Sequence, residues 1–253
     1  MLHFVGAGSG AVDLITVRGM KLLQTADVII YAGSLVNPQL LDYAKEGAVI
    51  LDSASMTLEE VIETVRNAEE VSQMTVRLHT GDPSLYGAIR EQMDLLDDLG
   101  ISYEITPGVS SFCGAAAALK AEYTLPDVSQ TVIITRMEGR TPVPQKEEIS
   151  LLASHNATMV IFLSTSMLGE LSERLIAGGY DPLSPAAIVY KATWPDEKVF
   201  HCSVSELERT ARENNITKTA LITVGGFLAN DYQRSKLYDP EFTHGYRQAK
   251  DKP

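Results

Sequence analysis

Short apolar runs alternate with longer amphipathic segments along the first half of the chain. Five of these runs predict strands: 3–5, 28–31, 48–51, 74–78 and 102–105. Helices are predicted between them, at about 13–23, 38–41, 57–70, 88–99 and 112–119. Asp13 is the expected cap of the first helix, with Val17 on its apolar side, and Thr57 with Glu60 has the spacing of a capping box. This alternation indicates a parallel sheet covered by helices.

The alternation resumes after a proline-containing crossing at 121–129. Further strands are predicted at 131–135, 158–163, 186–191, 199–202 and 220–224, with helices near 147–154, 168–177 and 204–214. The last residues are polar with scattered tyrosines. We therefore predict two α/β domains, 1–120 and 121–230, followed by a polar tail at 231–253.

Two turns of unusual backbone chemistry follow two of the predicted strands. Gly-Asp-Pro at 81–83 follows the run 74–78, and Pro-Gly-Val-Ser-Ser at 107–111 follows the run 102–105. If these strands are neighbours in a parallel sheet, both turns leave it at the carboxyl edge, where open α/β folds bind ligands. Each turn also has a simpler interpretation: an Asx turn at Asp82 and a plain helix N-cap at the serine pair.

A glycine-rich turn, Gly-Ala-Gly-Ser-Gly-Ala at 6–11, follows the first strand. Its spacing loosely fits a dinucleotide-binding fingerprint, in which a helix N-terminus receives a phosphate. That fingerprint also needs an acid at the end of the second strand to bind the ribose. Here Asp27 precedes that strand, which ends at Ala-Gly-Ser, 32–34. A nicotinamide dinucleotide is therefore disfavoured, although we expect the glycine turn and Ser34 to line the same cleft.

The overall charge restricts the possible partners. There are 33 acidic and 21 basic side chains and a formal net charge of −12, which argues against nucleic acid or an anionic membrane surface. Cys113, Cys202 and the five histidines show no spacing of a metal site or disulfide framework. No apolar run reaches transmembrane length and no signal-peptide pattern opens the chain. We expect a cytoplasmic protein without a metal.

Three motifs carry a family resemblance: Val-Gly-Ala-Gly-Ser-Gly at 5–10, Gly-Asp-Pro-Ser-Leu-Tyr-Gly at 81–87 and Thr-Pro-Gly-Val-Ser-Ser at 106–111. Together they resemble the tetrapyrrole methylases, a family of S-adenosylmethionine-dependent enzymes, over about residues 2–226. Two more segments, 31–38 and 135–144, resemble the branch of the family that methylates C-11 of precorrin-4 or cobalt-precorrin-4 in cobalamin synthesis.

The resemblance implies two α/β domains with S-adenosylmethionine in the cleft between them, and usually a homodimer. Carried over position by position, it implies that the methyl donor contacts Ser9, Thr80, Gly81, Asp82, Leu85, Ser110, Ser111, Leu163, Ala192 and Ala220. Methyl transfer mainly requires positioning and exclusion of water, so Asp82 is assigned a donor-orienting role. Uroporphyrinogen methylases carry an aspartate where Ala32 stands, so that carboxylate does not transfer, and no catalytic base is singled out.

The implied substrate explains how an acidic enzyme would bind an anion. A reduced tetrapyrrole carries acetate and propionate groups, and arginine binds carboxylates bidentately. Arg136 and Arg140, in a proline-rich loop after a predicted strand, are therefore the leading substrate-binding candidates, with Lys191 and Ser34 next. The alternative for each cation is a solvated surface charge.

Three other functions are considered. A sibling methylase would act at another ring carbon of a corrin precursor, and a non-catalytic module would bind an adenine dinucleotide without methyl transfer. Family members that modify RNA or a protein histidine are disfavoured, the RNA branch by the acidic charge and both by the branch segments. The cobalt form of the substrate is favoured on overall similarity, because the protein need not touch the metal.

Overall fold

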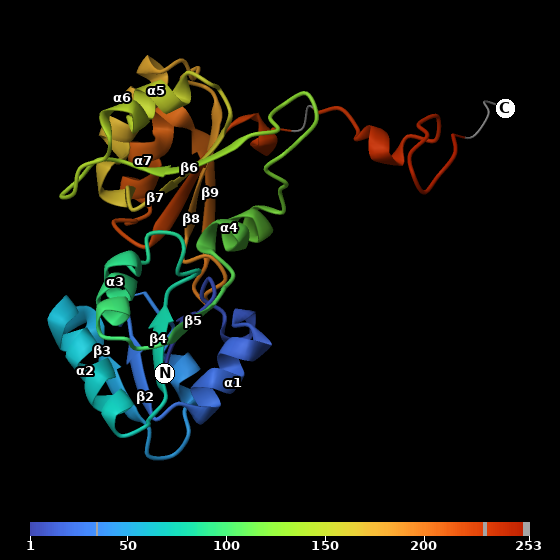
Figure 1. Ribbon diagram of the computed structural model, residues 1–253. Coiled ribbons are helices and arrows are strands. Elements are labelled where there is room, and N and C mark those ends of the chain that lie inside the picture. Colours follow the sequence, from blue (N-terminus) through green and yellow to red (C-terminus); the bar gives the residue numbers. More distant parts are fainter. Residues whose placement is uncertain (34, 230–231, 250–253) are drawn as a thin grey trace. The chain divides into compact units, whose positions relative to one another are not determined.

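The computed structural model describes residues 1–33, 35–229 and 232–249. The chain divides into two units. The first is Met1–Ala115 with Lys191–Glu197, and the second is Ala116–Tyr190 with Lys198–Pro253. Each unit contains one five-stranded sheet with helices packed on it (Figure 1). The predicted fold class of two α/β domains is confirmed.

The first sheet is parallel throughout and has the strand order β3-β2-β4-β1-β5. Its strands are β1 (Leu2–Gly6), β2 (Val28–Tyr31), β3 (Val49–Asp52), β4 (Thr75–His79) and β5 (Tyr103–Thr106). The expectation that the strands at 74–78 and 102–105 are neighbours is wrong, because β1 pairs with both and separates them. Every residue of β1 is buried, which suits a strand covered on both faces. At the carboxyl edge the glycine turn that follows β1 therefore lies between the turns that follow β4 and β5.

Helices cover both faces of this sheet (Figure 1). On one side lies α1 (Val17–Thr25), and on the other lie α2 (Leu58–Glu70) and α3 (Arg90–Asp98). The capping box that opens α2 is confirmed. The first helix differs from its prediction: Thr16 caps it by accepting a hydrogen bond from the Gly19 amide, and Val17 is exposed. Asp13 lies instead in a separate 3-10 turn.

The second sheet is mixed and has the order β6-β7-β10-β8-β9. Its strands are β6 (Val132–Arg136), β7 (Thr158–Phe162), β8 (Pro185–Tyr190), β9 (Lys198–Ser203) and β10 (Ala220–Val224). Only β6 and β7 run parallel, and β10 is antiparallel to both of its neighbours. No helix separates β8 from β9 in the chain, so this pair is antiparallel too. The second half therefore departs from the simple alternation of the first.

One apolar core holds the second unit together. It is formed where α5 (Ile149–Ala153), α6 (Leu168–Ala177) and α7 (Leu207–Glu213) pack on the same side of the sheet (Figure 1). The remaining α-helix, α4 (Ser111–Leu119), follows β5 and contains the point at which the first unit ends and the second begins.

Short 3-10 helices occur at Val12–Leu14, Pro38–Tyr43, Ser53–Ser55, Gln145–Glu147, Thr165–Met167, Val204–Glu206, Gly226–Leu228 and Lys236–Tyr238.

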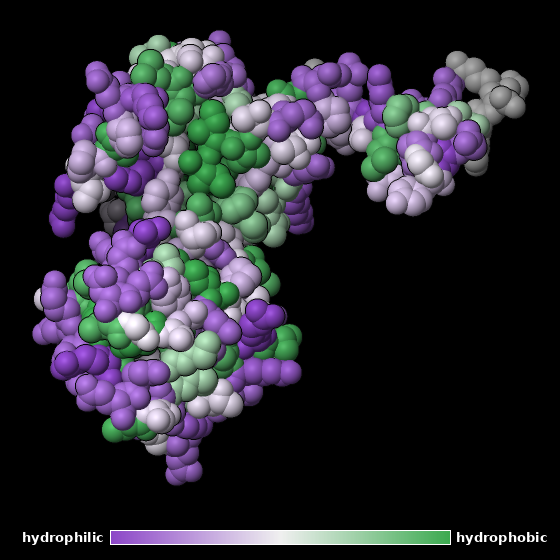
Figure 2. Space-filling model, in the orientation of Figure 1, coloured by the Kyte–Doolittle hydropathy of each residue, from purple (hydrophilic) through white to green (hydrophobic). Residues whose placement is uncertain are grey.

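Figure 2 shows that the outward side of α2 and α3 is mostly hydrophilic. In the described part of the chain, no helix is both long enough and apolar enough to span a membrane.

Candidate functional site

Three loops leave the carboxyl edge of the first sheet and touch one another. The glycine turn after β1 pairs with the loop after β4: the Gly8 amide donates to the Gly81 carbonyl at 3.2 Å, and the Gly81 amide donates to the Gly8 carbonyl at 2.9 Å. The loop after β5 closes on both, since a Cβ on Gly108 would lie 2.1 Å from the Gly81 carbonyl oxygen and 2.7 Å from the Cα of Gly6. We call these segments, 6–11, 80–87 and 106–111, the three-loop edge. Only glycine permits so close an approach of the backbones.

Asp82 joins two of these loops. Its Oδ1 accepts hydrogen bonds from the Ser84 amide at 2.8 Å and from the Ser84 hydroxyl, which is the predicted Asx turn. Its Oδ2 accepts a bond from the Gly108 amide at 2.8 Å. Partial burial raises the pKa of this carboxyl, but the bonds from Ser84 and Gly108 outweigh it and leave the pKa below its ordinary value. Both oxygens of the Asp82 carboxylate are therefore engaged in hydrogen bonds that hold these loops.

The other first-unit residues predicted to contact the methyl donor lie on the same edge. Gly81 has a φ of 61°, as its turn requires. Ser110 is buried just before α4, and its Cα lies 3.4 Å from where a Cβ on Gly81 would stand. The hydroxyl of Thr80 is buried without a hydrogen-bond partner in the structure. Leu85 and Ser111 are half-buried. The edge thus offers backbone groups, hydroxyls and an unpaired polar atom to a ligand.

A segment distant in sequence also belongs to this unit. Lys191–Glu197 connects β8 to β9 of the second sheet, yet it contacts the glycine turn. The Thr193 hydroxyl accepts a hydrogen bond from the Ala11 amide at 3.0 Å and lies 3.0 Å from the Ser9 hydroxyl. Ala192, the neighbouring residue, is buried. Ser9 and Ala192, which are predicted donor contacts from opposite ends of the chain, therefore lie in one unit.

Two predicted donor contacts lie in the second unit. Leu163 follows β7, and Ala220 begins β10, which pairs with β7. The Ala220 carbonyl accepts a hydrogen bond from the Thr165 hydroxyl at 3.0 Å. Leu163 is 60% exposed and has a φ of 54°, although leucine rarely adopts the left-handed region. Backbone strain of this kind concentrates at ligand sites, so the strain at Leu163 makes the end of β7 a candidate ligand position.

The predicted substrate-binding cations have distinct environments. Arg136 donates hydrogen bonds to the carbonyls of Met137, Thr141 and Pro142 at 2.7–3.2 Å, so its guanidinium holds its own loop. Arg140, in the same loop, is exposed. Lys191 lies instead in the first unit, where it forms an ion pair with Asp196. Ser34 lies outside the described residues.

Two buried basic residues behind the edge were missed by the sequence analysis. Arg77 and His79 are on β4, all five residues of which are buried, and their two basic letters among apolar ones were the only signal in the sequence. Burial lowers the pKa of Arg77 to about 10, and burial together with the nearby Arg77 cation lowers the pKa of His79 to about 3. The Arg77 guanidinium donates to the Ile30 carbonyl at 3.2 Å. The imidazole of His79, the residue that precedes Thr80, is therefore neutral near pH 7.

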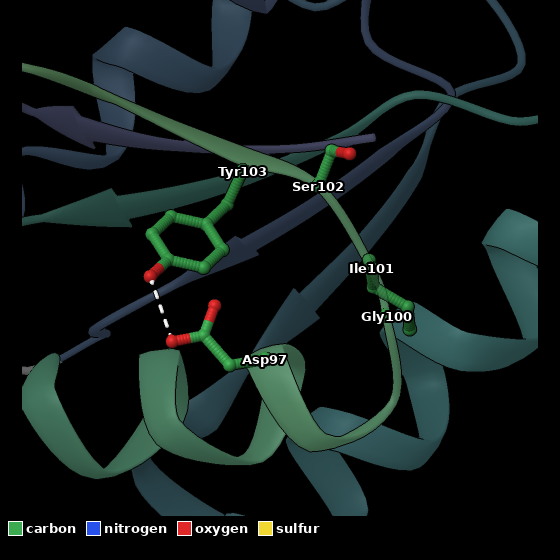
Figure 3. Close-up of a pocket in the computed structure, with 5 residues that line it drawn as sticks. All are labelled: Asp97, Gly100, Ile101, Ser102 and Tyr103. Carbon is green, nitrogen blue, oxygen red and sulfur yellow. Dashed lines mark hydrogen bonds between the residues drawn. The ribbon is translucent and has the colours of Figure 1, made fainter.

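A pocket on the first unit lies away from these residues. It is lined by Asp97, Gly100, Ile101, Ser102 and Tyr103, and the Tyr103 hydroxyl donates to the Asp97 carboxylate at 3.3 Å (Figure 3). This pocket is at the amino end of β5, opposite to the three-loop edge. It contains none of the residues predicted for donor or substrate.

The comparison with known families identifies the class of protein to which this edge belongs. The model of the Tetrapyrrole (Corrin/Porphyrin) Methylases matches residues 1–208. The chain belongs to this family, which confirms the resemblance seen in the motifs.

Individual relatives are similar over nearly the whole chain. The Cobalt-precorrin-4 C(11)-methyltransferase of Methanocaldococcus jannaschii is 53% identical over 97% of this chain and 95% of the relative. The Precorrin-4 C(11)-methyltransferase of Mycobacterium tuberculosis is 44% identical over 94% of this chain and 95% of the relative.

Solved structures show the same fold. The X-ray structure of a cobalt precorrin-4 methyltransferase superimposes with a TM-score of 0.88 at 49% identity, covering 90% of this chain and 95% of the other. A uroporphyrin-III C-methyltransferase from Thermus thermophilus has a TM-score of 0.73 at 22% identity, covering 90% and 93%.

Proposed function

We propose that this chain is an S-adenosylmethionine-dependent C-methyltransferase that acts on C-11 of cobalt-precorrin-4 in cobalamin biosynthesis. The observation that carries the proposal is the 53% identity to the Methanocaldococcus jannaschii cobalt-precorrin-4 C(11)-methyltransferase over 97% of the chain. Relatives named for metal-free precorrin-4 are 38–44% identical, so the cobalt form is the favoured substrate.

The three-loop edge fits an adenosyl methyl donor. Its glycines let the three loops pack backbone against backbone, so that their main-chain groups and the hydroxyls of Thr80, Ser110 and Ser111 lie at one edge. S-adenosylmethionine supplies an already activated methyl group, so the residues of the chain need only bind, orient and exclude water. We propose that Ser9, Thr80, Gly81, Asp82, Leu85, Ser110, Ser111, Leu163, Ala192 and Ala220 bind it.

Asp82 acts in this scheme as a positioning residue. Both of its carboxylate oxygens accept hydrogen bonds from the loops, and these bonds hold its pKa below the ordinary value. A carboxylate with a lowered pKa is a poor proton acceptor near neutral pH. Its contribution is therefore to keep the Gly81 and Gly108 loops in the conformation that receives the donor.

The cations of the second unit are proposed to bind the substrate. The exposed Arg140 presents a guanidinium that matches a propionate or acetate carboxylate. Arg136 holds the loop that carries Arg140, through its bonds to three loop carbonyls. We further propose, from the family resemblance, that the enzyme is a cytoplasmic homodimer. Light scattering of the purified protein would test whether it is a dimer.

One experiment tests the reaction. The protein is incubated with ¹³C-methyl S-adenosylmethionine and cobalt-precorrin-4, and the new methyl carbon is located by NMR, with metal-free precorrin-4 as a parallel substrate. A methyl at C-11, formed faster with the cobalt substrate, supports the proposal. A methyl at another carbon supports a sibling methylase. Calorimetry that finds NAD bound and S-adenosylhomocysteine not bound would indicate the nucleotide-binding module instead.

A further inference from the structure

We propose that Thr193 and Trp194 are positioning residues that hold the glycine turn in its donor-binding conformation. We call them the clamp. This inference rests on the proposed function, since it concerns how the same site binds S-adenosylmethionine. Neither residue was a predicted donor contact, and the clamp acts on the turn rather than on the reacting atoms.

The Thr193 hydroxyl carries one half of the clamp. It accepts a hydrogen bond from the Ala11 amide at 3.0 Å and is 3.0 Å from the Ser9 hydroxyl, so one oxygen bonds both sides of Gly10. A hydroxyl has two acceptor sites and one donor, which satisfies both contacts at once. Thr193 has a φ of 67°, an unfavourable value for a β-branched residue. Its amide is held by the Glu197 carboxylate at 2.5 Å, which stabilises this backbone.

The Trp194 indole carries the other half. A Cβ on Gly10 would lie 2.1 Å from the indole Cδ1, so the ring packs directly on the backbone of the turn. The Asn37 side chain also holds Gly10, by donating to its carbonyl at 2.8 Å. The ammonium of Lys191 is 5.4 Å from the centroid of the indole, within cation–π range. The ring is thereby fixed on its own segment and against the turn.

The clamp couples two predicted donor contacts. Ser9 is bound to Thr193, and Ala192 is the residue that precedes Thr193. Release of the clamp would therefore displace both contacts together. It would also free the Ala11 amide, which lies at the entry to the first helical turn of the unit. We expect the loss to weaken donor binding and to leave tetrapyrrole binding unchanged.

The test compares Thr193→Val, which keeps the shape and removes the hydroxyl, with Thr193→Ser, which keeps the hydroxyl. The probe is S-adenosylhomocysteine, titrated by calorimetry, together with the KM of each substrate and kcat. We expect Thr193→Val to weaken S-adenosylhomocysteine binding about fivefold to thirtyfold, the effect of one or two hydrogen bonds. The KM of S-adenosylmethionine should rise with it, the KM of the tetrapyrrole should not change, and Thr193→Ser should restore binding to within about threefold.

A second measurement needs no variant. Trp194 is the only tryptophan of the chain, so its fluorescence reports the clamp in the wild-type protein. We expect S-adenosylhomocysteine to change the emission of Trp194, and its accessibility to acrylamide, with the same Kd as calorimetry. Unchanged emission on saturation would overturn the proposal, as would a folded Thr193→Val protein with wild-type affinity.

The two proposals fail differently. If wild-type protein binds S-adenosylhomocysteine and transfers methyl groups while Thr193→Val binds equally well, only the clamp is wrong. If wild-type protein binds no S-adenosylhomocysteine and methylates nothing, the proposed function is wrong and the clamp is overturned with it.

Discussion

The carboxylate of Asp82 accepts a hydrogen bond from the amide of Gly108 at 2.8 Å. These residues follow β4 and β5, which are not neighbours, because β1 lies between them in the sheet. The bond therefore passes across the end of β1, where the glycine turn begins. It links the outer two members of the three-loop edge, and the glycine turn is enclosed between them.

Removal of this carboxylate should loosen the edge. We expect Asp82→Ala to lower the free energy of unfolding by about 1–3 kcal/mol, since the amides of Ser84 and Gly108 lose their acceptor. S-adenosylhomocysteine should bind more weakly as well. Urea unfolding and calorimetry measure the two effects.

Asp181→Ala is the matched control for that prediction. Asp181 also forms an Asx turn, accepting from the Leu183 amide at 2.7 Å, but this turn lies in the second unit. Its removal should leave S-adenosylhomocysteine affinity unchanged. Equal affinities for the Asp82→Ala and Asp181→Ala proteins would contradict a positioning role for Asp82.

Gly108 should not tolerate a side chain. In Gly108→Ala the added Cβ would meet the Gly81 carbonyl oxygen at 2.1 Å and the Gly6 Cα at 2.7 Å, and backbone atoms cannot turn aside as a side chain can. We expect a loss of about 3 kcal/mol or more in unfolding free energy. Gly245→Ala is the control, since its Cβ would meet nothing within 4 Å. Identical urea midpoints for the two variants would show that the Gly81 and Gly6 backbones do not pack closely against Gly108.

His79 should make stability depend on pH. Burial and Arg77 lower its native pKa to about 3, below the 6.5 of an unperturbed histidine. Below about pH 6.5 the unfolded chain binds a proton that the native protein does not, so the histidine destabilises the fold progressively as pH falls toward 3. One such proton changes the free energy of unfolding by ~1.4 kcal/mol per pH unit.

His79→Gln removes this proton while keeping a polar side chain of similar size. The plot of unfolding free energy against pH, measured in urea between pH 4 and 6.5, should become flatter by about one proton. His201→Gln, at an exposed position of β9, controls for the loss of a histidine. If His79→Gln has the same slope as the wild type, His79 is protonated in the native protein and the prediction fails.

Substitutions in the loop of Arg136 and Arg140 should weaken tetrapyrrole binding and leave donor binding unchanged. Arg136→Ala removes the donors that hold the carbonyls of Met137, Thr141 and Pro142. We expect the tetrapyrrole KM to rise about tenfold or more, from loss of charge-assisted bonds and of the loop conformation. S-adenosylhomocysteine affinity, measured by calorimetry, should stay the same.

Arg136 and Arg140 should respond differently to substitution. Arg136→Lys should not restore the KM, since one ammonium cannot reproduce a guanidinium fork. Arg140→Ala should raise the KM mainly at low salt, as expected for an exposed charge. A tetrapyrrole KM that is unchanged in both alanine variants would remove this loop from the substrate site.

Local chemistry in the sequence determined the elements and several of their details. The capping box of Thr57 and Glu60, the Asx turn of Asp82 and the positive φ of Gly81 involve residues within a few positions of one another. Their geometry therefore depends on short-range sterics and hydrogen bonds, which a sequence pattern contains. The motifs at the strand ends also indicated the family.

Only the tertiary structure decided which distant segments meet. The place of β1 between β4 and β5, the antiparallel pairing of β10, and the contact of Thr193 with Ser9 each join residues far apart in the chain. Such contacts are selected by burial and packing of the whole chain, and no local pattern records them. The sequence thus located the three-loop edge, and the fold showed that β1 lies at its centre and that Trp194 packs on its glycine turn.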